Sequence, residues 1–257
     1  MAYREHRNVT ATDSLETRLT INGRYATFDF HAWVLDRLAA RPNMDVLDVG
    51  CGTGVHAAKI LDAVGPDGTV SAFDLSADSV EELRRKAGGD TRLHTAVGDM
   101  KEAARIIESF PVRRYDLAYS VYALWYSPDH HATLDAMRSA LKPGGRLLVC
   151  TPNAPNGLRE TLKRFGMRRP ELDQATNFGP NLLEPYFRAH FDDVRIHLRR
   201  NELHITSVDD VLAFFRAAGY YDPALEPSLH RQVEMDILNL SYFTFEKNSY
   251  LIEGLVS

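Results

Sequence analysis

The sequence predicts an α/β fold built on a doubly wound, mostly parallel sheet. Between residues 44 and 151, short apolar runs alternate with longer segments whose apolar residues recur at helical spacing. Strands separated by helices of this length are joined by right-handed crossovers, which cover both faces of a parallel sheet. The chain of 257 residues is 44% hydrophobic, enough for a sizeable core without disulfide bonds.

Seven strands are expected along the whole chain. Gly65-Pro66-Asp67-Gly68 and Lys142-Pro143-Gly144-Gly145 are strong turn sequences that separate neighbouring elements. The expected helices are 55–64, 77–87, 101–109, 129–141, 208–218 and 229–240. The expected strands are 45–49, 69–74, 93–97, 115–121, 146–151, 194–198 and a last, hairpin-like strand at 243–256.

The composition argues against several classes of protein. A formal charge of -5 disfavours a nucleic-acid-binding protein that works through a large basic face, although a local basic patch remains compatible with it. No apolar run approaches the roughly 20 residues of a membrane span, and residues 1–7 are polar, without a signal-peptide pattern behind them. Cys51 and Cys150 lie in apolar strand contexts, as small buried thiols of a reducing compartment do. We expect a cytoplasmic protein that binds neither nucleic acid nor a membrane.

A glycine-rich turn follows the first strand. Gly50, Gly52 and Gly54 allow the backbone to approach a ligand closely. A dinucleotide site would place its third glycine at Val55, and Asp48 would repel a pyrophosphate at this helix N-terminus. The ligand is therefore expected to be uncharged or cationic near the turn.

Three acids lie where strands of the predicted sheet end. Asp74 follows Gly54 by 20 residues and is suited to accept hydrogen bonds from both hydroxyls of a ribose. Asp48 and Asp99 reach the same rim of the sheet, where open α/β sheets bind ligands. The alternative is that each acid caps a neighbouring helix. The three acids together with the glycine turn favour a nucleoside site.

At this point the motifs resemble a known family. The stretch Leu47-Asp48-Val49-Gly50-Cys51-Gly52-Thr53-Gly54 resembles the first motif of class I S-adenosylmethionine-dependent methyltransferases. The resemblance continues, in order and spacing, through residues 73–76, 98–100, 115–118 and 141–145. It covers about residues 44–151, whereas the remaining segments match only the general plan. It implies a Rossmann-like sheet and S-adenosylmethionine as the cofactor.

The resemblance also implies roles for individual residues. The glycine turn would pass the methionine part of the cofactor, Asp74 would bind the ribose, and Leu75 would contact the adenine. Asp99 would accept a hydrogen bond from the adenine amino group, with Met100 beside it, and Ser120 would line the methionine end. The whole set of implied cofactor-binding residues is Tyr25, Asp48, Gly50, Cys51, Gly52, Gly54, Asp74, Leu75, Asp99, Met100 and Ser120.

The length allows one decorated domain or two small ones, and the strand–helix rhythm with the linked motifs favours one methyltransferase domain over residues 1–257. Its parts would be a helical N-terminal lid (1–43), the cofactor-binding core (44–151), a cap insertion after the fifth strand (152–190) and strands and helices that complete the sheet (191–257). Tyr25 of the lid would shield the sulfonium by a cation–π contact, unless the lid is simply a helix packed on the sheet. The basic residues between 159 and 169 either recognise an anionic acceptor or solvate a helix face.

Methyl transfer from a sulfonium is an in-line displacement, so the main task of the protein is positioning. A general base is needed only when the acceptor keeps its proton at neutral pH. The lack of an obvious base in the sequence therefore does not argue against methyl transfer. The segment after the fourth strand lacks the Asn/Asp-Pro-Pro-aromatic motif of enzymes that methylate exocyclic amines. Its aromatic residues suit an apolar small molecule or, alternatively, core packing. The candidates for substrate binding are Trp125 and Tyr126. The candidates for catalysis are Tyr122, His130 and His204, although His130 alternatively lies at a solvated helix start.

The sequence thus predicts a methyltransferase that acts on an oxygen or nitrogen of a small molecule. The alternatives are a methyltransferase acting on tRNA or protein, and a non-methylating protein that binds the same cofactor, since fold does not fix function. No residues have the spacing of a metal site. The oligomeric state and the identity of the acceptor are left open.

Overall fold

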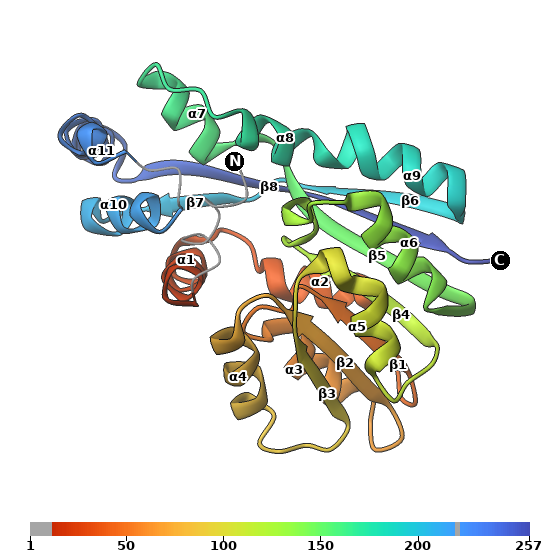
Figure 1. Cartoon of the computed structure of the whole chain (residues 1–257). Coiled ribbons are helices and arrows are strands. Elements are labelled where there is room, and N and C mark those ends of the chain that lie inside the picture. Colours follow the sequence, from red (N-terminus) through yellow and green to blue (C-terminus); the bar gives the residue numbers. More distant parts are fainter. Residues whose placement is uncertain (1–11, 219–221) are drawn as a thin grey trace. The chain divides into compact units, whose positions relative to one another are not determined.

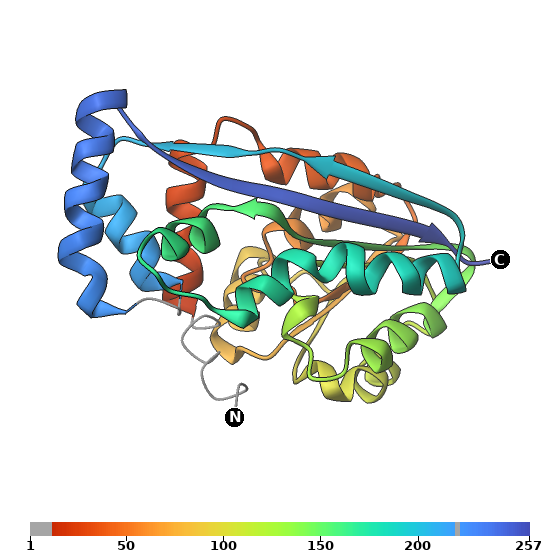
Figure 2. The ribbon, with the colours of Figure 1, turned by 90° about the horizontal axis from the view of Figure 1, so that it is seen from above.

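A computed structural model describes residues 12–218 and 222–257 (Figures 1 and 2). These residues form two compact units, each built from separate stretches of the chain. The core unit comprises Phe30–Thr151, Phe178–His197 and Tyr250–Ser257. The helical unit comprises the described residues of Met1–Asp29, Pro152–Asn177 and Leu198–Ser249. Residues 1–11 of the predicted lid lie outside the described part of the chain.

The core unit contains the predicted parallel sheet. Five strands lie in the order β3-β2-β1-β4-β5 and pair in parallel, and β8 and β6 extend the sheet beyond β5. The order reverses between β1 and β4, which is where open α/β sheets form their ligand crevice. The strands are β1 Asp45–Val49, β2 Thr69–Asp74, β3 Leu93–Val97, β4 Tyr115–Val121, β5 Leu141–Asn156, β6 Asp192–Arg199 and β8 Phe243–Leu255.

Helices cover both faces of this sheet, as the alternating pattern predicted. Because neighbouring residues of a strand point to opposite faces, Ala118 of β4 belongs to one apolar cluster and Leu117 and Tyr119 to the other. The cluster of Ala118 includes residues of α5, α6 and α9, and the opposite cluster includes residues of α2, α3 and α4. These helices are α2 Phe30–Leu38, α3 Val55–Ala63, α4 Ala77–Lys86, α5 Ala103–Ser109, α6 His130–Ser139 and α9 Glu184–His190.

The turn predicted at residues 142–145 lies inside a strand in the structure. Residues 142–145 lie within β5, because Leu141 pairs with Tyr115 before the register shifts and Arg146 pairs with Leu117. The Pro-Gly-Gly sequence therefore forms an irregularity inside the strand, and the preceding helix ends at Ser139. Proline donates no backbone hydrogen bond, so its presence inside a strand is accommodated at such an irregularity.

The helical unit contains a strand that the sequence analysis missed. β7, Glu202–Ile205, pairs antiparallel with the first part of β8, so residues 12–218 and 222–257 form eight strands where seven were expected. Side chains of Leu203 and Phe245 from this pair join an apolar cluster with residues of the surrounding helices. The helices of this unit are α1 Thr12–Tyr25, α7 Gly157–Arg164, α8 Pro170–Phe178 (whose last residue belongs to the core unit), α10 Val208–Ala217 and α11 Glu226–Leu240.

The boundaries of the two units differ from those of the predicted segments. α2 was assigned to the N-terminal lid and α9 to the cap insertion, yet both pack in the core unit. Strands β5, β6 and β8 each have residues in both units. A single domain over residues 1–257 stays a prediction.

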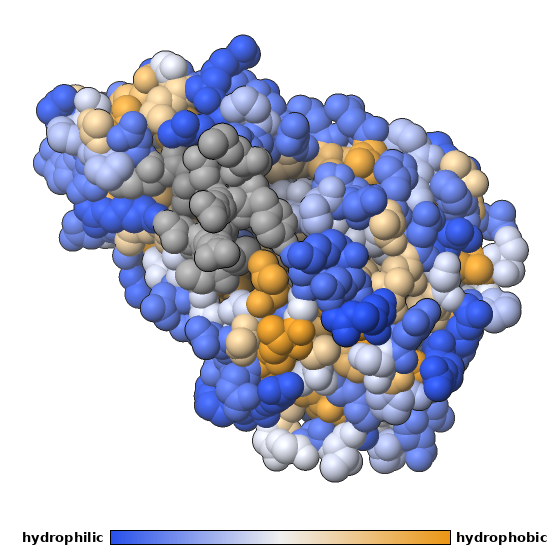
Figure 3. Space-filling model, viewed as in Figure 1, coloured by the Kyte–Doolittle hydropathy of each residue, from blue (hydrophilic) through white to orange (hydrophobic). Residues whose placement is uncertain are grey.

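The surface is mainly polar on the face shown in Figure 3, where hydrophobic residues form small areas between hydrophilic ones. Among the described residues, no helix combines the length and the apolar character needed to cross a bilayer.

Candidate functional site

The glycine turn between β1 and α3 needs glycine for its own conformation. Gly50, Gly52 and Gly54 have φ angles of 79°, 50° and 75°, in the left-handed region that side chains disfavour. A Cβ atom on Gly50 would lie 2.4 Å from the Cβ of Ala123, and one on Gly54 would lie 2.3 Å from Cδ1 of Leu83. The turn is thus packed tightly against its surroundings.

Asp74 holds this turn to the end of β2. Its Oδ2 accepts a hydrogen bond from the backbone N–H of Gly52 at 2.8 Å, and its Oδ1 accepts one from Ser76 at 2.9 Å. Burial raises the pKa of Asp74, and these backbone hydrogen bonds oppose the rise. Leu75, the next residue, is 51% exposed, so an apolar side chain lies open beside the carboxylate.

Asp48 lies deeper, before the turn, and is 3% exposed. Its Oδ2 accepts a hydrogen bond of 2.6 Å from the hydroxyl of Tyr119, the residue opposite it on β4. Burial, with a contribution from the charge of Asp74, raises the pKa of Asp48 to about 7. Burial and the two acids also raise the pKa of Cys51, which keeps the thiol protonated and unreactive.

The end of β3 brings two more predicted residues to this edge. Asp99 caps the short helix η2 (Met100–Glu102) by accepting a hydrogen bond from the backbone N–H of Lys101 at 2.9 Å. The side chain of Met100 reaches Gly50, where an added Cβ would lie 2.7 Å from its Cε. Asp99 therefore has the capping role considered as an alternative, and its contact with the adenine stays a prediction.

Ser120 is fully buried near the end of β4, and its Oγ has no hydrogen-bond partner among the described residues. Thr151 of β5, which sequence reasoning missed, is also fully buried and its hydroxyl also lacks a described partner. Ser120 lies opposite Val149, so Ser120 and Thr151 share a face of the sheet. Unpaired buried hydroxyls are rare, and these two provide hydrogen-bonding capacity beside the strand-order reversal.

Aromatic side chains meet after β4, within the core unit. Tyr122 has a φ of 55°, a strained value for a residue other than glycine. Its ring contacts the edge of Phe30 (centroids 5.2 Å apart) and Trp125 (5.5 Å), while Trp33 lies beside Phe30 (6.2 Å) and Tyr126 beside Trp125 (4.9 Å). We call these five residues the aromatic wall. Tyr122, Trp125 and Tyr126 were expected from the sequence, whereas the contribution of α2 was not.

A pair of histidines adjoins the aromatic wall. Nδ1 of His31 lies 3.1 Å from Nε2 of His56, and the Phe30 ring contacts both imidazoles. Burial, together with His31, lowers the pKa of His56 to about 3, so His56 is neutral at physiological pH. Sequence reasoning missed this pair, although His56 follows the glycine turn by two residues.

His130, a predicted catalytic residue, begins α6 and is half-buried rather than solvated. Its Nε2 lies 3.3 Å from the carbonyl oxygen of Trp125, and its ring packs against Phe178 with centroids 4.8 Å apart. Burial lowers its pKa. His130 is therefore close to the aromatic wall, and its catalytic role stays a prediction.

Two predicted site residues belong to the helical unit. The hydroxyl of Tyr25 donates a hydrogen bond of 2.6 Å to Asp210, which also pairs with Arg24. His204 stacks on Tyr242 with centroids 4.1 Å apart, and its Nε2 lies 3.3 Å from Oε2 of Glu202. Their roles toward a ligand stay predictions. Within residues 12–218 and 222–257, no group of three or more metal-binding side chains is arranged to hold a metal ion.

Comparison with known proteins identifies the class to which this fold and site belong. A family model described as a methyltransferase domain matches residues 24–185, more than half of the chain. The chain therefore belongs to the methyltransferase family, and the resemblance to class I S-adenosylmethionine-dependent methyltransferases is confirmed.

Curated relatives from bacteria match part of the chain. It is 30% identical over 136 residues to malonyl-[acyl-carrier protein] O-methyltransferase 2 of Ilyobacter polytropus, covering 52% of this chain and 49% of that protein. It is 35% identical over 117 residues to the ubiquinone/menaquinone biosynthesis C-methyltransferase UbiE of Shewanella frigidimarina, covering 46% of each. The matched regions span half or less of the length of these relatives.

Solved structures show the same fold. A putative methyltransferase from Bacillus halodurans superposes with a TM-score of 0.60 at 18% identity, covering 88% of this chain and 98% of that one. A methyltransferase from Geobacter sulfurreducens in complex with S-adenosylhomocysteine gives a TM-score of 0.51 at 17% identity, covering 86% and 89%.

Proposed function

We propose that the core unit binds S-adenosylmethionine and that the protein transfers the methyl group to an oxygen or nitrogen of a small molecule. The observation that carries the proposal is the tightly packed glycine turn, bonded to Asp74 and adjoined by the buried carboxyl of Asp48. It lies where the strand order reverses, the usual ligand position in such sheets.

The residues at this edge fit the parts of the cofactor. The carboxylate of Asp74 is suited to the ribose hydroxyls, and the exposed Leu75 offers an apolar surface to the adenine. Asp48, with its capacity to ionise near neutral pH, suits the positively charged methionine end. The buried hydroxyls of Ser120 and Thr151 supply further polar groups there.

The aromatic wall is proposed to hold the acceptor. When bound, S-adenosylmethionine supplies an activated methyl group, so this chain has to align the acceptor and exclude water. Tyr122, Trp125 and Phe30 present rings that suit the apolar part of a small molecule. The relatives named as O- and C-methyltransferases support the reaction class but leave the acceptor open.

Isothermal titration with S-adenosylmethionine tests cofactor binding. We expect Asp74→Ala to weaken binding by roughly a hundredfold, because the hydrogen bonds that this carboxylate accepts from the ribose hydroxyls are lost. Asp78→Ala, an exposed acid four residues further on in α4, is the matched control and should bind like the wild type. Since Asp74 also holds Gly52, Asp74→Asn keeps an acceptor for that bond. Equal affinities in all variants would refute the ribose assignment.

Transfer of a labelled methyl group to cellular extracts tests the reaction. We expect label in the small-molecule fraction. Label that appears only when RNA or protein is present would instead support a macromolecular acceptor. Tight cofactor binding without transfer to any fraction would support a non-methylating protein.

A further inference from the structure

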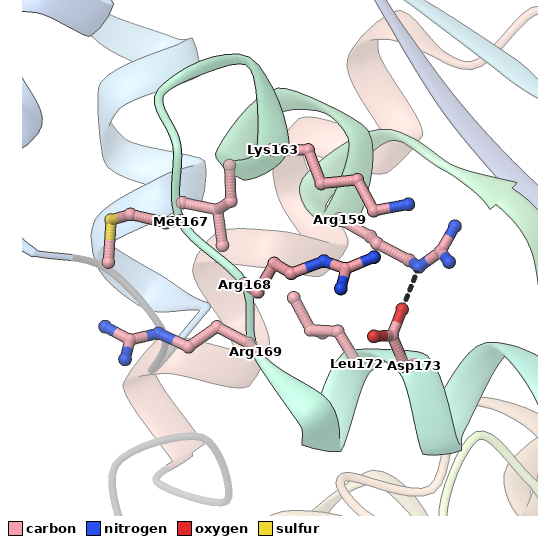
Figure 4. A pocket seen from close by; sticks show the side chains of 8 residues that line it. Arg159, Lys163, Met167, Arg168, Arg169, Leu172 and Asp173 are labelled. Carbon is pink, nitrogen blue, oxygen red and sulfur yellow. Dashed lines mark hydrogen bonds and ion pairs between the residues drawn. The ribbon is translucent and has the colours of Figure 1, made fainter.

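A hollow with a strongly basic lining lies in the helical unit, between α7, the following loop and α8. It is a shallow, open depression: the space between its side chains is about 190 Å³ with open solvent included, and it encloses no room for a water-sized molecule. Its lining combines positive charge with apolar side chains and one acid (Figure 4). We call it the basic hollow, and its residues are Arg159, Leu162, Lys163, Met167, Arg168, Arg169, Leu172 and Asp173.

Two of its four cations have acidic partners. Nε of Arg159 donates to Asp173, and its Nη1 donates to Glu160 at 2.6 Å. Glu160 also pairs with Lys163 at 3.6 Å. The negative charges of Glu160 and Asp173 are therefore engaged by Arg159 and Lys163.

The other two cations remain in excess. The guanidinium groups of Arg168 and Arg169 make no hydrogen bond or ion pair with another residue of the described ranges, 12–218 and 222–257. Nε of Arg169 is buried and lacks an acceptor there. Figure 4 shows the charged ends of Arg159, Lys163 and Arg168 on the same side of the hollow, with Arg169 extending to the other side. Like charges gathered in this way repel one another unless an anion lies between them.

We propose that the basic hollow binds an anionic group, a phosphate or a carboxylate, of an amphipathic ligand. The planar guanidinium of Arg168 matches the two oxygens of such a group, and arginine is the preferred residue for this recognition. Leu162, Met167 and Leu172 line the same hollow and contact the apolar part of the ligand. The overall charge of -5 makes this basic site a local feature.

The anion site does not depend on the proposed cofactor site. Its residues all belong to the helical unit, whereas the glycine turn, Asp74 and the aromatic wall belong to the core unit. Failure to bind S-adenosylmethionine would leave the anion site untouched.

Titration calorimetry with n-octyl phosphate, below its micelle concentration and at low salt, tests the site. We expect binding that inorganic phosphate displaces and n-octanol does not. Arg168→Gln should weaken the affinity by about tenfold, because a charge-assisted hydrogen bond is lost. Arg169→Gln provides a second test. The matched control is Arg164→Gln, an exposed arginine at the end of α7 that does not line the hollow.

These measurements distinguish a specific anion site from the absence of one. Absence of binding, equal affinities of Arg168→Gln and wild type, or an equal loss in Arg164→Gln would overturn the proposal. n-Octanoate in place of the phosphate ester shows whether a carboxylate suffices. Co-sedimentation with phosphatidylglycerol vesicles that is lost in Arg168→Gln would identify a lipid headgroup as the source of the anion. Binding of octyl phosphate without co-sedimentation would identify a soluble ligand. Thermal melts show whether each variant is folded.

Discussion

Asp48 has a pKa of about 7, so its carboxyl group is roughly half ionised at neutral pH. A cationic ligand beside it stabilises the carboxylate and lowers that pKa. Binding of S-adenosylmethionine at pH 7 should therefore release about half a proton per protein, and the affinity should rise with pH up to about 7. Calorimetry in buffers of different ionisation enthalpy measures the proton count. Asp48→Asn should abolish the buffer dependence, and a wild type with equal enthalpies in all buffers would contradict the role of Asp48.

Asp48 and His56 have opposite effects on stability as pH changes. The pKa of Asp48 is raised from 3.8 to about 7 in the folded state, so its contribution to stability is present below pH 3.8 and is lost as pH rises toward 7. The pKa of His56 is lowered from 6.5 to about 3, so its contribution is present above pH 6.5 and is lost as pH falls toward 3. The two effects largely cancel between pH 4 and 6.5.

Single variants should reveal these opposing effects. In urea unfolding from pH 4 to 6.5, we expect the free energy of unfolding of Asp48→Asn to rise with pH, relative to the wild type, by roughly 1 kcal/mol per pH unit. The free energy of unfolding of His56→Gln should instead fall with pH, relative to the wild type, by a similar amount. Parallel pH profiles for the wild type and both variants would show that neither group is perturbed in the folded state.

At the level of residues, the sequence identified groups that lie within local motifs. Asp48, Asp74 and Asp99 each lie at or near the end of a strand, beside a recognisable turn, so their places in the sheet could be predicted. The His31–His56 pair could not, because it joins two helices separated by the whole of β1 and no local pattern links them. The sequence also did not indicate that Thr151 is buried. Thr151 was expected at the end of the fifth strand, and nothing in the sequence shows that its hydroxyl lacks a hydrogen-bond partner.

At the level of elements, Gly54 connects the turn to α4 through its contact with Leu83. Gly54→Ala should destabilise the protein because a Cβ would both strain the backbone, at φ 75°, and overlap Leu83. Gly89→Ala is the control, since Gly89 has a similar φ of 80° but nothing within 4 Å of an added Cβ. We expect a loss of about 1–2 kcal/mol for Gly89→Ala and a clearly larger one for Gly54→Ala in urea unfolding. Equal losses would show that the contact with Leu83 is readily relieved.

The ring of Tyr122 lies in the segment after β4, at a residue with a left-handed backbone. Tyr122→Asn retains a residue that tolerates the left-handed backbone but removes the ring from the aromatic wall. We expect cofactor affinity within about twofold of the wild type and methyl transfer to the extract acceptor reduced by roughly tenfold or more. Tyr122→Phe keeps the ring and should retain most of the transfer. A severe loss in Tyr122→Phe would instead assign a chemical role to the hydroxyl.

The strands of the sheet differ in how closely they follow the bounds expected from the sequence. β1, β2, β3 and β4 have the expected bounds because each is an apolar run between clear turns. β7 was missed because only four residues form it, and its pairing with β8 depends on a segment about forty residues later. β5 extends beyond its expected end at Thr151 to Asn156, although Pro152 and Pro155 indicate a break.

For the whole molecule, the sequence predicted the architecture of the sheet but not the division of the chain into two units. Strand–helix alternation is a local signal, whereas the units combine stretches far apart in the sequence. The helical unit gathers parts of the predicted lid, the cap and the C-terminal region around one apolar cluster. Apolar residues show that a segment packs, but they do not specify its partner.

Strands β5, β6 and β8 contribute to both units, so neither unit has a complete set of strands of its own. We therefore expect the chain to unfold in one cooperative transition. Trp33 and Trp125, the two tryptophans, both belong to the core unit, whereas far-UV circular dichroism reports on the helices of both units. The two signals should give the same midpoint in urea. S-adenosylhomocysteine at a hundred times its Kd should shift both together, by about 2.7 kcal/mol, because it binds only the folded chain. If the circular dichroism signal shows a second transition that the ligand leaves unmoved, the helical unit unfolds independently and the single-domain prediction is wrong.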